Sequence, residues 1–290
     1  MPDKYVRKPI NLGEARIIFL KVKEALSKSG LPDLDYALNP YMGCWHSCIY
    51  CYARLYTWYK EIADNWGRII AVKENIVEVL RREIKYKPRG IVGVGTITDA
   101  YQPVEALYEI TQKSLKVLFS AGFHASIQTK NPLILRDLDL LVENRRLIDV
   151  GFTITTLNDQ VARVIEPRAP PPKARAKALE IIASHGIETW VFMGPIIPGY
   201  NDDVSTIEEL VRLAKETNSI FYYDKLRIKK FMYNPTHPLH HVVAKTKRYD
   251  WRKLYHRIEE ICHKYNVKCL PGMEYISKES DTTLDKYISK

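Results

Sequence analysis

The sequence has no apolar segment long enough to cross a membrane. A spanning helix needs about 20 consecutive apolar residues, and no such run occurs in the 290 residues, whose mean hydropathy is −0.26. The first residues, MPDKYVRKPINLGEAR, also lack the apolar centre of a signal peptide. We therefore predict a cytoplasmic protein with no membrane partner.

Cysteine is scarce, with five residues in the whole sequence. Three of these, Cys44, Cys48 and Cys51, lie within eight positions. An odd number and such close spacing do not suit a framework of disulfide bonds, and in a reducing compartment clustered cysteines more often bind metal. The few cysteines therefore indicate a metal or iron–sulfur site.

Acidic residues are nearly absent from one stretch of the chain. Between Asp224 and Arg257 there are ten Lys or Arg and only two acids, Asp224 and Asp250. This stretch carries +8 (10 − 2) of the formal net charge of +10. A local excess of positive charge favours an anionic partner.

Strand-like and helix-like segments alternate along most of the chain. Helical periodicity marks residues 74–87, 104–120, 174–184, 203–217 and 249–264, and β-rich runs mark residues 91–96, 123–129, 148–156, 187–193 and 219–228. With one more strand before Cys44, the pattern gives about six βα units. This is too few for a closed eight-stranded barrel, so we predict an α/β fold, a partial (β/α)6 barrel of the TIM type with a C-terminal α/β extension.

No linker or repeat divides the chain. Residues 1–290 are therefore predicted to form one domain, with a core over about residues 35–230 and a basic extension, residues 231–290, packed on the barrel. In parallel barrels the chemistry gathers on loops at the carboxyl ends of the strands. The candidate functional residues fall in such loops.

The three cysteines form a C-x3-C-x2-C motif in a loop that follows a predicted strand and Gly43. A complete iron–sulfur cubane takes four thiolates, so three would leave one iron open to a small chelating molecule. A zinc site made of the same cysteines and His46 is the alternative, although structural zinc sites usually draw on two separated pairs of ligands. Tyr50 and Tyr52 flank the last cysteine, where they either pack around a cluster or relay a radical.

The residues around this motif resemble a known family. Residues 39–54 (NPYMGCWHSCIYCYAR) are similar to the radical S-adenosylmethionine (SAM) superfamily, and more narrowly to its branch of spore photoproduct lyase and DNA-repair-photolyase-like proteins. The resemblance covers about residues 35–230. It implies a partial (β/α)6 barrel in which Cys44, Cys48 and Cys51 hold a [4Fe–4S] cluster, with SAM bound to the open iron through its amino and carboxylate groups. Reductive cleavage of SAM would then give a 5′-deoxyadenosyl radical that takes a hydrogen atom from the substrate, with electrons from a partner such as a ferredoxin or flavodoxin.

Several polar residues match the family's cofactor-binding positions. Thr98 and Asp99, at the end of the second predicted strand, fall where the superfamily contacts the amino group of SAM; a helix cap is the other interpretation. Lys130, after the third strand, matches the position that in spore photoproduct lyase pairs with the cofactor carboxylate; a solvated lysine is the alternative. Thr153 and Thr155 alternate on the fourth strand and so share a face, from which a hydroxyl would reach the ribose or carboxylate.

Two later loops complete the predicted cofactor site. Glu166-Pro167-Arg168 resembles an acid-Pro-Arg sequence of the family, in which Arg168 would pair with a carboxylate; a surface pair of Glu166 with Arg168 is the alternative. Residues 193–202 (MGPIIPGYND) resemble the fifth-strand loop whose apolar backbone packs on adenine, with Pro195 as the predicted contact. An ordinary strand–turn–helix with Asp202 as a helix cap would have a similar sequence.

The sequence departs from spore photoproduct lyase at a position that affects the end of the reaction. That family depends on a cysteine near the end of its second strand to return a hydrogen atom to the product, and Thr96 stands at the nearest position here. The hydrogen of a hydroxyl is held too strongly for that step. Cys262 and Cys269 lie among apolar residues and are predicted to be small core residues. We therefore expect a reaction different from repair of the spore photoproduct.

The basic stretch suggests a substrate class. Its charged residues alternate with aromatic residues, a composition that suits phosphate neutralisation and base stacking in a nucleic-acid groove. Lys229, Lys230, Lys247 and Arg248 are the predicted contacts to DNA or RNA; a merely basic surface is the alternative. Three hypotheses follow: a radical enzyme that repairs or modifies nucleic acid, a radical enzyme acting on a small molecule or protein, and a non-enzymatic metal-binding protein that binds nucleic acid.

Overall fold

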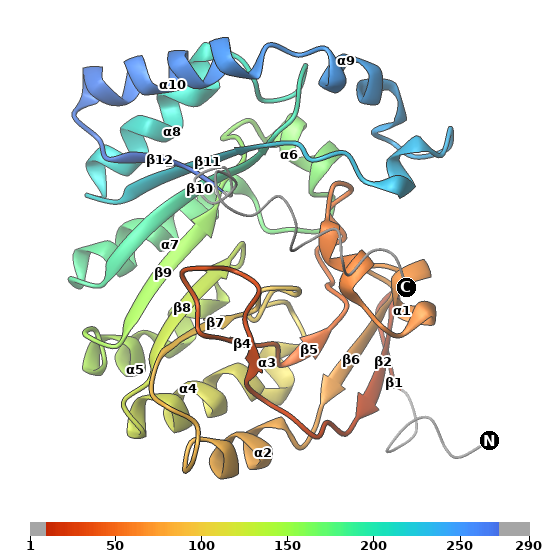
Figure 1. The fold of residues 1–290 in the computed structure, drawn as a ribbon, viewed down its shortest axis with the longest axis vertical. Helices are drawn as coiled ribbons and strands as arrows, with labels where there is room; N and C mark the ends of the chain where they lie inside the picture. The colour runs from red at the N-terminus through yellow and green to blue at the C-terminus, as the bar shows by residue number, and fades with distance from the viewer. Residues whose placement is uncertain (1–9, 273–290) are drawn as a thin grey trace.

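The computed structural model describes residues 10–272. They form a larger curved sheet with helices on its outer side and a smaller sheet beside it (Figure 1). None of the described helices is long and apolar enough to cross a membrane.

The strands, in chain order, are β1 (Ile10–Leu12), β2 (Ala15–Leu20), β3 (Ser27–Lys28), β4 (Tyr36–Leu38), β5 (Tyr41–Met42), β6 (Ile69–Lys73), β7 (Ile91–Val94), β8 (His124–Thr129), β9 (Ile148–Thr153), β10 (Glu188–Ile196), β11 (Ile220–Lys225) and β12 (Cys269–Pro271). The α-helices are α1 (Lys60–Asp64), α2 (Ile76–Glu83), α3 (Glu105–Tyr108), α4 (Ile110–Ser120), α5 (Leu138–Glu143), α6 (Asp159–Ile165), α7 (Pro172–Ser184), α8 (Val204–Glu216), α9 (Val243–Lys247) and α10 (Trp251–Tyr265). Short 3-10 helices are η1 (Tyr52–Tyr56), η2 (Pro132–Asp137), η3 (Lys230–Tyr233) and η4 (His240–Val242).

The larger sheet has the strand order β12-β11-β10-β9-β8-β7-β4-β3. Neighbours from β4 to β12 are parallel, and β3 pairs antiparallel with β4 at one edge. The six strands from β4 to β11 lie in chain order, each joined to the next through at least one helix, because parallel strands need such crossovers. The predicted partial (β/α)6 barrel is confirmed.

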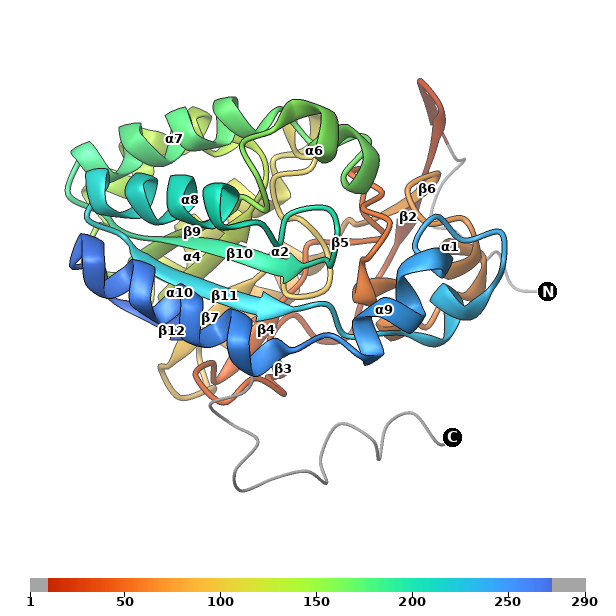
Figure 2. The same ribbon diagram turned by 90° about the horizontal axis from the view of Figure 1, so that it is seen from above.

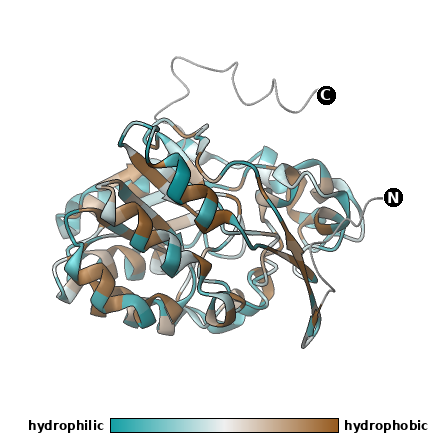
Figure 3. Ribbon diagram, turned by 90° about the horizontal axis from the view of Figure 1, so that it is seen from below, coloured by the Kyte–Doolittle hydropathy of each residue, from teal (hydrophilic) through white to brown (hydrophobic). Residues whose placement is uncertain are grey.

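The outer helices bury one side against this sheet. In α8, Ile207, Leu210, Val211 and Ala214 are buried and recur at helical spacing, so they lie on one face. Figure 2 shows α7 and α8 along β9 and β10, and Figure 3 shows the apolar colour on the strands and the polar colour on the outer sides of helices. The helical periodicity of the sequence therefore reports the packing of helices on the sheet.

The smaller sheet, with the order β1-β2-β6-β5, was not predicted from the sequence. β2 (ARIIFL) and β6 (IIAVK) each contain a run of four apolar residues that is buried on both faces, and such runs lack the alternation that identifies a strand. One face packs Ile18, Leu20 and Met42 against Ile62 of α1. Since β5 ends at Met42, this sheet anchors the start of the cysteine loop.

The predicted helix over residues 104–120 is two helices, α3 and α4. The break occurs at Glu109, whose φ of 53° is left-handed. The buried Glu105 carboxylate accepts hydrogen bonds from the amides of Thr111 at 2.8 Å and Gln112 at 3.2 Å. Because the first amides of a helix have no partner within it, Glu105 starts α4 by satisfying them, and periodicity alone could not show this.

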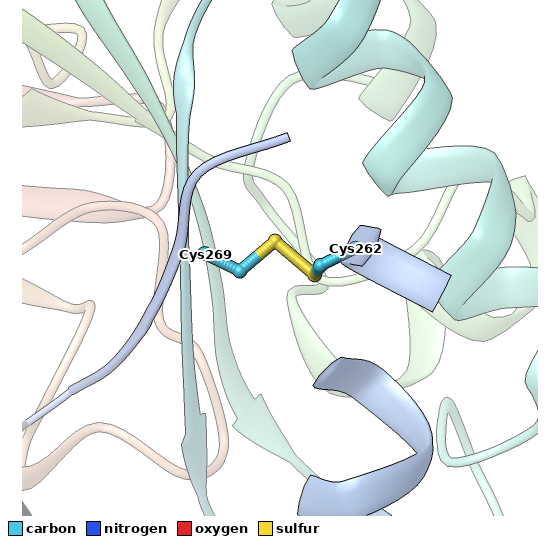
Figure 4. Close-up of a disulfide and its surroundings, with 2 residues drawn as sticks. All are labelled: Cys262 and Cys269. Carbon is cyan, nitrogen blue, oxygen red and sulfur yellow. A yellow bond between two sulfur atoms is a disulfide. The ribbon is translucent and has the colours of Figure 1, made fainter. Parts of the chain in front are cut away.

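The end of the basic stretch and the residues after it add a helix and a strand to the larger sheet. β12 pairs with β11 as a further parallel strand, and α10 packs beside α8. Cys262 of α10 and Cys269 of β12 form a disulfide across a Cα–Cα distance of 6.2 Å (Figure 4). Cys262 lies in the core and Cys269 packs against it, as predicted, but the disulfide between them was not predicted. The six residues between them turn back at Asn266, which brings the two side chains together.

Gly151 of β9 carries a prediction about packing. It lies opposite Trp190 of β10, and a Cβ at this position would meet the indole ring at 2.2 Å. Trp190 Nε1 donates to Asp149 at 2.7 Å, so the ring cannot shift without straining that bond. We expect Gly151→Ala to lower the free energy of unfolding by about 1–3 kcal/mol, measured by urea denaturation.

Gly30→Ala is the matched control, because no atom lies within 4 Å of a Cβ built at Gly30. Its free energy of unfolding should change by less than about 0.5 kcal/mol. Equal stability of the two variants would contradict the close packing at Gly151.

Candidate active site

The clustered cysteines lie in the loop between β5 and η1, next to the segments that follow β7, β8 and β9. All three are free thiols; Cys44 and Cys48 are buried and Cys51 is partly exposed. Burial raises the pKa of Cys48 to about 12 and also raises the pKa values of Cys44 and Cys51. The three thiols are electrostatic neighbours of one another, so without a compensating positive charge they stay protonated.

The start of the cysteine loop is held by the segment after β7. Gly43 has a φ of 79°, and a Cβ there would meet the Ile69 carbonyl at 2.5 Å, so only glycine fits. The Gly43 carbonyl accepts from Thr98 Oγ1 at 2.7 Å and Gln102 Nε2 at 3.2 Å. The Trp45 amide donates to Gln102 Oε1 at 2.8 Å. Because Gln102 is completely buried, these bonds satisfy backbone groups that water does not reach.

Asp99 holds the middle of the same loop. Its carboxylate lies 3.3 Å from His46 Nδ1 and accepts from Thr129 Oγ1 at 2.7 Å. The amides of Lys130 and Tyr101 donate to it at 2.8 Å and 2.9 Å. Burial alone would raise the pKa of Asp99, but His46 and these donors lower it to about 2. The carboxylate is therefore ionised, and its oxygens are already occupied by the protein.

Glu166 contacts the loop from the other side. Tyr50 Oη donates to Glu166 Oε1, and Arg175 Nη1 donates to Glu166 Oε2. Lys130 Nζ lies 4.0 Å from Glu166 Oε1 and 5.7 Å from the centre of the Tyr50 ring. Burial alone would raise the pKa of Glu166, but Arg175 and Lys130 hold it below its usual value. An ionised carboxylate thus lies between two cations, all within electrostatic reach of Cys48.

The two threonines predicted on β9 have different surroundings. β9 ends at Thr153, so the predicted alternation does not extend to Thr155. Thr153 Oγ1 accepts from Gln128 Nε2 at 2.8 Å, whereas the buried Thr155 Oγ1 has no hydrogen-bond partner in the described part of the chain. Asn201 Nδ2 donates to the carbonyls of Thr155 at 2.9 Å and Pro195 at 3.1 Å. Asn201 thereby joins the loop after β9 to the end of β10.

Arg168 faces away from Glu166, and the alternative Glu166–Arg168 pair does not form. The Arg168 guanidinium donates to the Gly67 carbonyl and to Glu14 Oε2, each at 2.7 Å. It therefore ties the loop after α6 to residues bordering the smaller sheet. Asp203, rather than Asp202, caps α8 by accepting from the Thr206 amide at 2.9 Å.

Thr96, at the position where spore photoproduct lyase has a cysteine, is joined to its neighbours by hydrogen bonds. Its Oγ1 accepts from Asn39 Nδ2 at 3.1 Å, and its carbonyl accepts from Tyr52 Oη at 2.9 Å. Tyr52 is 39% exposed. Since Cys262 and Cys269 form a disulfide, the only free thiols of the chain are those of the C-x3-C-x2-C motif.

The zinc alternative is not supported. His46 Nδ1 lies 3.3 Å from Asp99 Oδ2, and the His46 side chain is 1% exposed. Within residues 10–272, no group of three or more His, Cys, Asp or Glu side chains converges closely enough to hold one metal ion.

Sequence reasoning missed Gln102 and Arg175 and gave Glu166 only a surface role. One signal for Arg175 was present, because it lies in the buried stripe of α7 with Pro172, Leu179 and Ile182. A charged residue in an apolar stripe needs a buried partner. Gln102 had no comparable signal, since its role depends on a loop distant in sequence.

Part of the basic stretch forms an exposed cationic surface. Lys230, Lys247 and Arg248 are exposed, and none of them forms an ion pair within residues 10–272. Lys247 Nζ lies 5.0 Å from the centre of the exposed Tyr233 ring. Lys229 is partly buried. Three of the four predicted contacts therefore present unneutralised charge.

This surface borders the cysteine loop. Ile49 and Tyr50 pack against a cluster that includes Met232 of η3 and Val242 of η4. The Arg54 guanidinium, on η1 just after the motif, lies 4.7 Å from the centre of the Phe231 ring of η3. Figure 2 shows β10 and β11 pointing toward α9 and α1. The basic stretch thus covers the end of the barrel at which the cysteines lie.

The role of Gln102 can be tested by Gln102→Leu, which keeps the volume but leaves the Gly43 carbonyl with one donor and the Trp45 amide with none. We expect the free energy of unfolding of the metal-free protein to fall by about 1–3 kcal/mol, measured by denaturant titration. Gln160→Leu, on an exposed position of α6, is the control and should change it by less than about 0.5 kcal/mol. A Gln102→Leu protein as stable as this control would show that the bonds do not hold the loop.

Comparison with known sequences assigns the chain to a family. The Radical SAM superfamily model matches residues 38–214. An uncharacterized protein of Methanocaldococcus jannaschii is 32% identical over 214 residues, which cover 73% of this chain and 78% of that protein. An uncharacterized protein of Acidianus two-tailed virus is 32% identical over 194 residues, which cover 64% of each chain.

Solved structures share the fold at low sequence identity. A mutant of spore photoproduct lyase has a TM-score of 0.64 and 16% identity, covering 88% of this chain and 81% of the lyase. Streptococcus suis SuiB bound to S-adenosylmethionine has a TM-score of 0.55 and 13% identity, covering 81% of this chain and 49% of SuiB. The chain therefore belongs to the radical SAM superfamily and is a radical SAM enzyme, in a superfamily that uses a [4Fe–4S] cluster and S-adenosylmethionine.

Proposed function

We propose that Cys44, Cys48 and Cys51 hold the [4Fe–4S] cluster of this enzyme and that SAM binds beside it. The observation that carries this proposal is the set of three free, neighbouring thiols at the barrel's open end, in a loop fixed by Gln102 and Asp99. Their donor chemistry fits, because thiolates bind iron–sulfur clusters and three leave one iron open. Held by these three thiolates, a bound cluster would supply the electron for reductive cleavage of SAM to methionine and a 5′-deoxyadenosyl radical, the group that would abstract a hydrogen atom from the substrate.

Lys130 and Thr155 are the side chains best placed to bind SAM. Burial alone would lower the pKa of Lys130, but Cys48 and Glu166 hold it above its usual value, so the ammonium stays charged and suits the carboxylate of SAM. The unpartnered Thr155 hydroxyl suits the ribose or carboxylate. A buried hydroxyl without a partner is costly, and a bound cofactor would satisfy it. Thr153 and Pro195 border the same region through Asn201 and β9.

Thr98 and Asp99 have a different proposed role. Their side chains contact Gly43, His46 and Thr129, so we propose that they support the cysteine loop and act on SAM only through it. Arg168 similarly serves the contact with Glu14. Tyr50 is proposed to position the loop through Glu166, and a relay role for Tyr52 remains a prediction.

The hydrogen atom that completes the reaction has to come from a donor other than a cysteine thiol. Thr96 has a hydroxyl, and the chain has no free thiol beyond the motif. Repair by a cysteine donor, as expected of spore photoproduct lyase, is therefore not what we propose.

We further propose a nucleic-acid substrate, DNA or RNA, for repair or modification. The exposed cations Lys230, Lys247 and Arg248 border the cysteine loop, with Tyr233 beside Lys247 as a stacking surface. A spore photoproduct lyase of the same fold has been solved with bound AdoMet and dinucleoside spore photoproduct. A small-molecule or protein substrate is the alternative. The non-enzymatic hypothesis is wrong, because the chain belongs to an enzyme superfamily. A ferredoxin or flavodoxin is the proposed electron donor.

Cleavage of SAM tests the cluster assignment. The anaerobically reconstituted, dithionite-reduced protein should convert SAM to 5′-deoxyadenosine and methionine, whereas Cys44→Ala should form neither above background because it lacks one iron ligand. Products are measured by liquid chromatography and mass spectrometry. The double variant Cys262→Ala/Cys269→Ala is the control and should keep the activity. Full activity of Cys44→Ala, or none in iron-loaded wild type, would overturn the assignment.

Oligonucleotide binding tests the substrate class. Reversing Lys229, Lys230, Lys247 and Arg248 to Glu should weaken binding about ten-fold or more near 0.1 M salt and flatten its salt dependence, measured by fluorescence anisotropy. The control reverses four exposed cations on other surfaces, Lys116, Arg146, Lys173 and Lys215. Unchanged affinity in the first variant, or equal loss in both, would favour the alternative substrates.

A further inference from the structure

A unit of four side chains, centred on a buried ion pair, joins the cysteine loop to the barrel. It consists of Tyr50 from the loop, Lys130 from the end of β8, Glu166 from the end of α6 and Arg175 from α7. The Glu166 carboxylate contacts all three others: the Tyr50 hydroxyl, Arg175 Nη1 and, at 4.0 Å, Lys130 Nζ. The Glu166 and Arg175 side chains are 0% and 1% exposed. The Glu166–Arg175 pair is therefore shielded from solvent, whereas Tyr50 and Lys130 are only partly buried.

Arg175 has a fixed orientation in this unit. Its Nε donates to the Pro170 carbonyl at 2.8 Å, and its Nη1 also donates to the Thr153 carbonyl at 3.1 Å. These bonds hold the guanidinium between the Pro-rich loop and the end of β9. Arg175 thus holds one carboxylate oxygen of Glu166 in place. The other oxygen accepts the hydrogen bond from Tyr50 of the cysteine loop. A change at Glu166 would be transmitted directly to the loop.

The unit also places charge beside the thiols. Lys130 and Arg175 contribute two positive charges and Glu166 one negative charge, which leaves one net positive charge. After burial, Lys130, Glu166 and Arg175 are among the groups that act most strongly on Cys48. In a poorly hydrated interior such charges interact much more strongly than in water. Negative charge that develops near Cys48 is therefore sensitive to each of them.

We propose that Glu166 is a positioning residue that sets the reduction potential of the cluster, because it holds Tyr50, Lys130 and Arg175 in one unit with one net positive charge beside Cys48. The proposal rests on the proposed cluster ligands. Reduction adds an electron, so positive surroundings favour it and negative surroundings oppose it. Loss of the Glu166 charge raises the potential, and loss of the Arg175 charge lowers it. Loss of both charges leaves the net charge unchanged.

The test is an electron-paramagnetic-resonance redox titration of the reconstituted protein without SAM. Glu166→Gln should shift the midpoint potential upward and Arg175→Met should shift it downward. The double variant Glu166→Gln/Arg175→Met should return close to wild type. Glu208→Gln is the charge-matched control: Glu208 pairs with Lys264 on the surface of α8, so its loss should leave the potential unchanged.

A merely structural role would give a different pattern. Stability of the metal-free proteins, measured by denaturation, would fall in the single variants while all midpoint potentials stayed equal to wild type, and this result would overturn the proposal. If Glu166→Gln does not fold, Arg175→Met and the double variant decide by the same criterion. Failure of wild type to assemble a cluster would contradict the proposed function instead, so the two failures are distinguishable.

Tyr50→Phe separates position from charge. It removes the phenol's bond to Glu166 and keeps every charge, so the midpoint potential should shift less than in Glu166→Gln. Amide exchange in residues 44–51 of the metal-free protein should become faster, because the loop loses its contact with Glu166. A Tyr50→Phe protein with unchanged exchange would show that Glu166 does not position the loop.

Discussion

The turn that begins the cysteine loop buries backbone groups that only another segment can satisfy. Gly43 and Trp45 present a carbonyl and an amide away from water, and both are bonded to the Gln102 side chain, with Thr98 as a second donor to the carbonyl. An unsatisfied buried backbone group costs about as much as a lost hydrogen bond. The position of the three thiols therefore depends on the segment after β7. This segment is in turn fixed by the parallel pairing of β4, β7 and β8.

Two buried carboxylates then hold the loop from opposite sides. Asp99 faces His46, and Glu166 accepts from Tyr50; both partners lie between the cysteines of the motif. Each carboxylate is also bonded to rigid parts of the barrel, Asp99 to the end of β8 and Glu166 to α7. Contacts of the residues between the cysteines thus fix the loop to the barrel. In metal sites the residues that contact the ligands determine the orientation of the ligands. Here the residues that hold the cysteine loop come from the segments at the ends of β7, β8 and β9.

Periodicity revealed the barrel because each outer helix has one apolar side and each inner strand is a short β-rich run. It could not reveal the smaller sheet, where β2 and β6 each contain an unbroken run of four apolar residues, or the division at Glu109, which depends on Glu105 capping α4. The cysteine motif was evident from spacing alone. Gln102, Glu166 and Arg175 were not, because their partners are distant in sequence: Gln102 and Trp45 are 57 positions apart, and Tyr50 and Glu166 are 116 apart. The Cys262–Cys269 disulfide was missed for a different reason, since its two residues are close in sequence but meet only after a turn.

Hydrogen exchange at the Trp45 amide in the metal-free protein measures most directly whether the protein itself builds the loop. This amide donates to the completely buried Gln102 side chain, so its exchange requires an opening of the structure. Exchange at least about a hundred-fold slower than in an unstructured peptide, before any iron is added, is the predicted result. Exchange as fast as in a peptide, slowed only after the cluster is reconstituted, would show that the cluster orders the loop and would contradict the central role of Gln102.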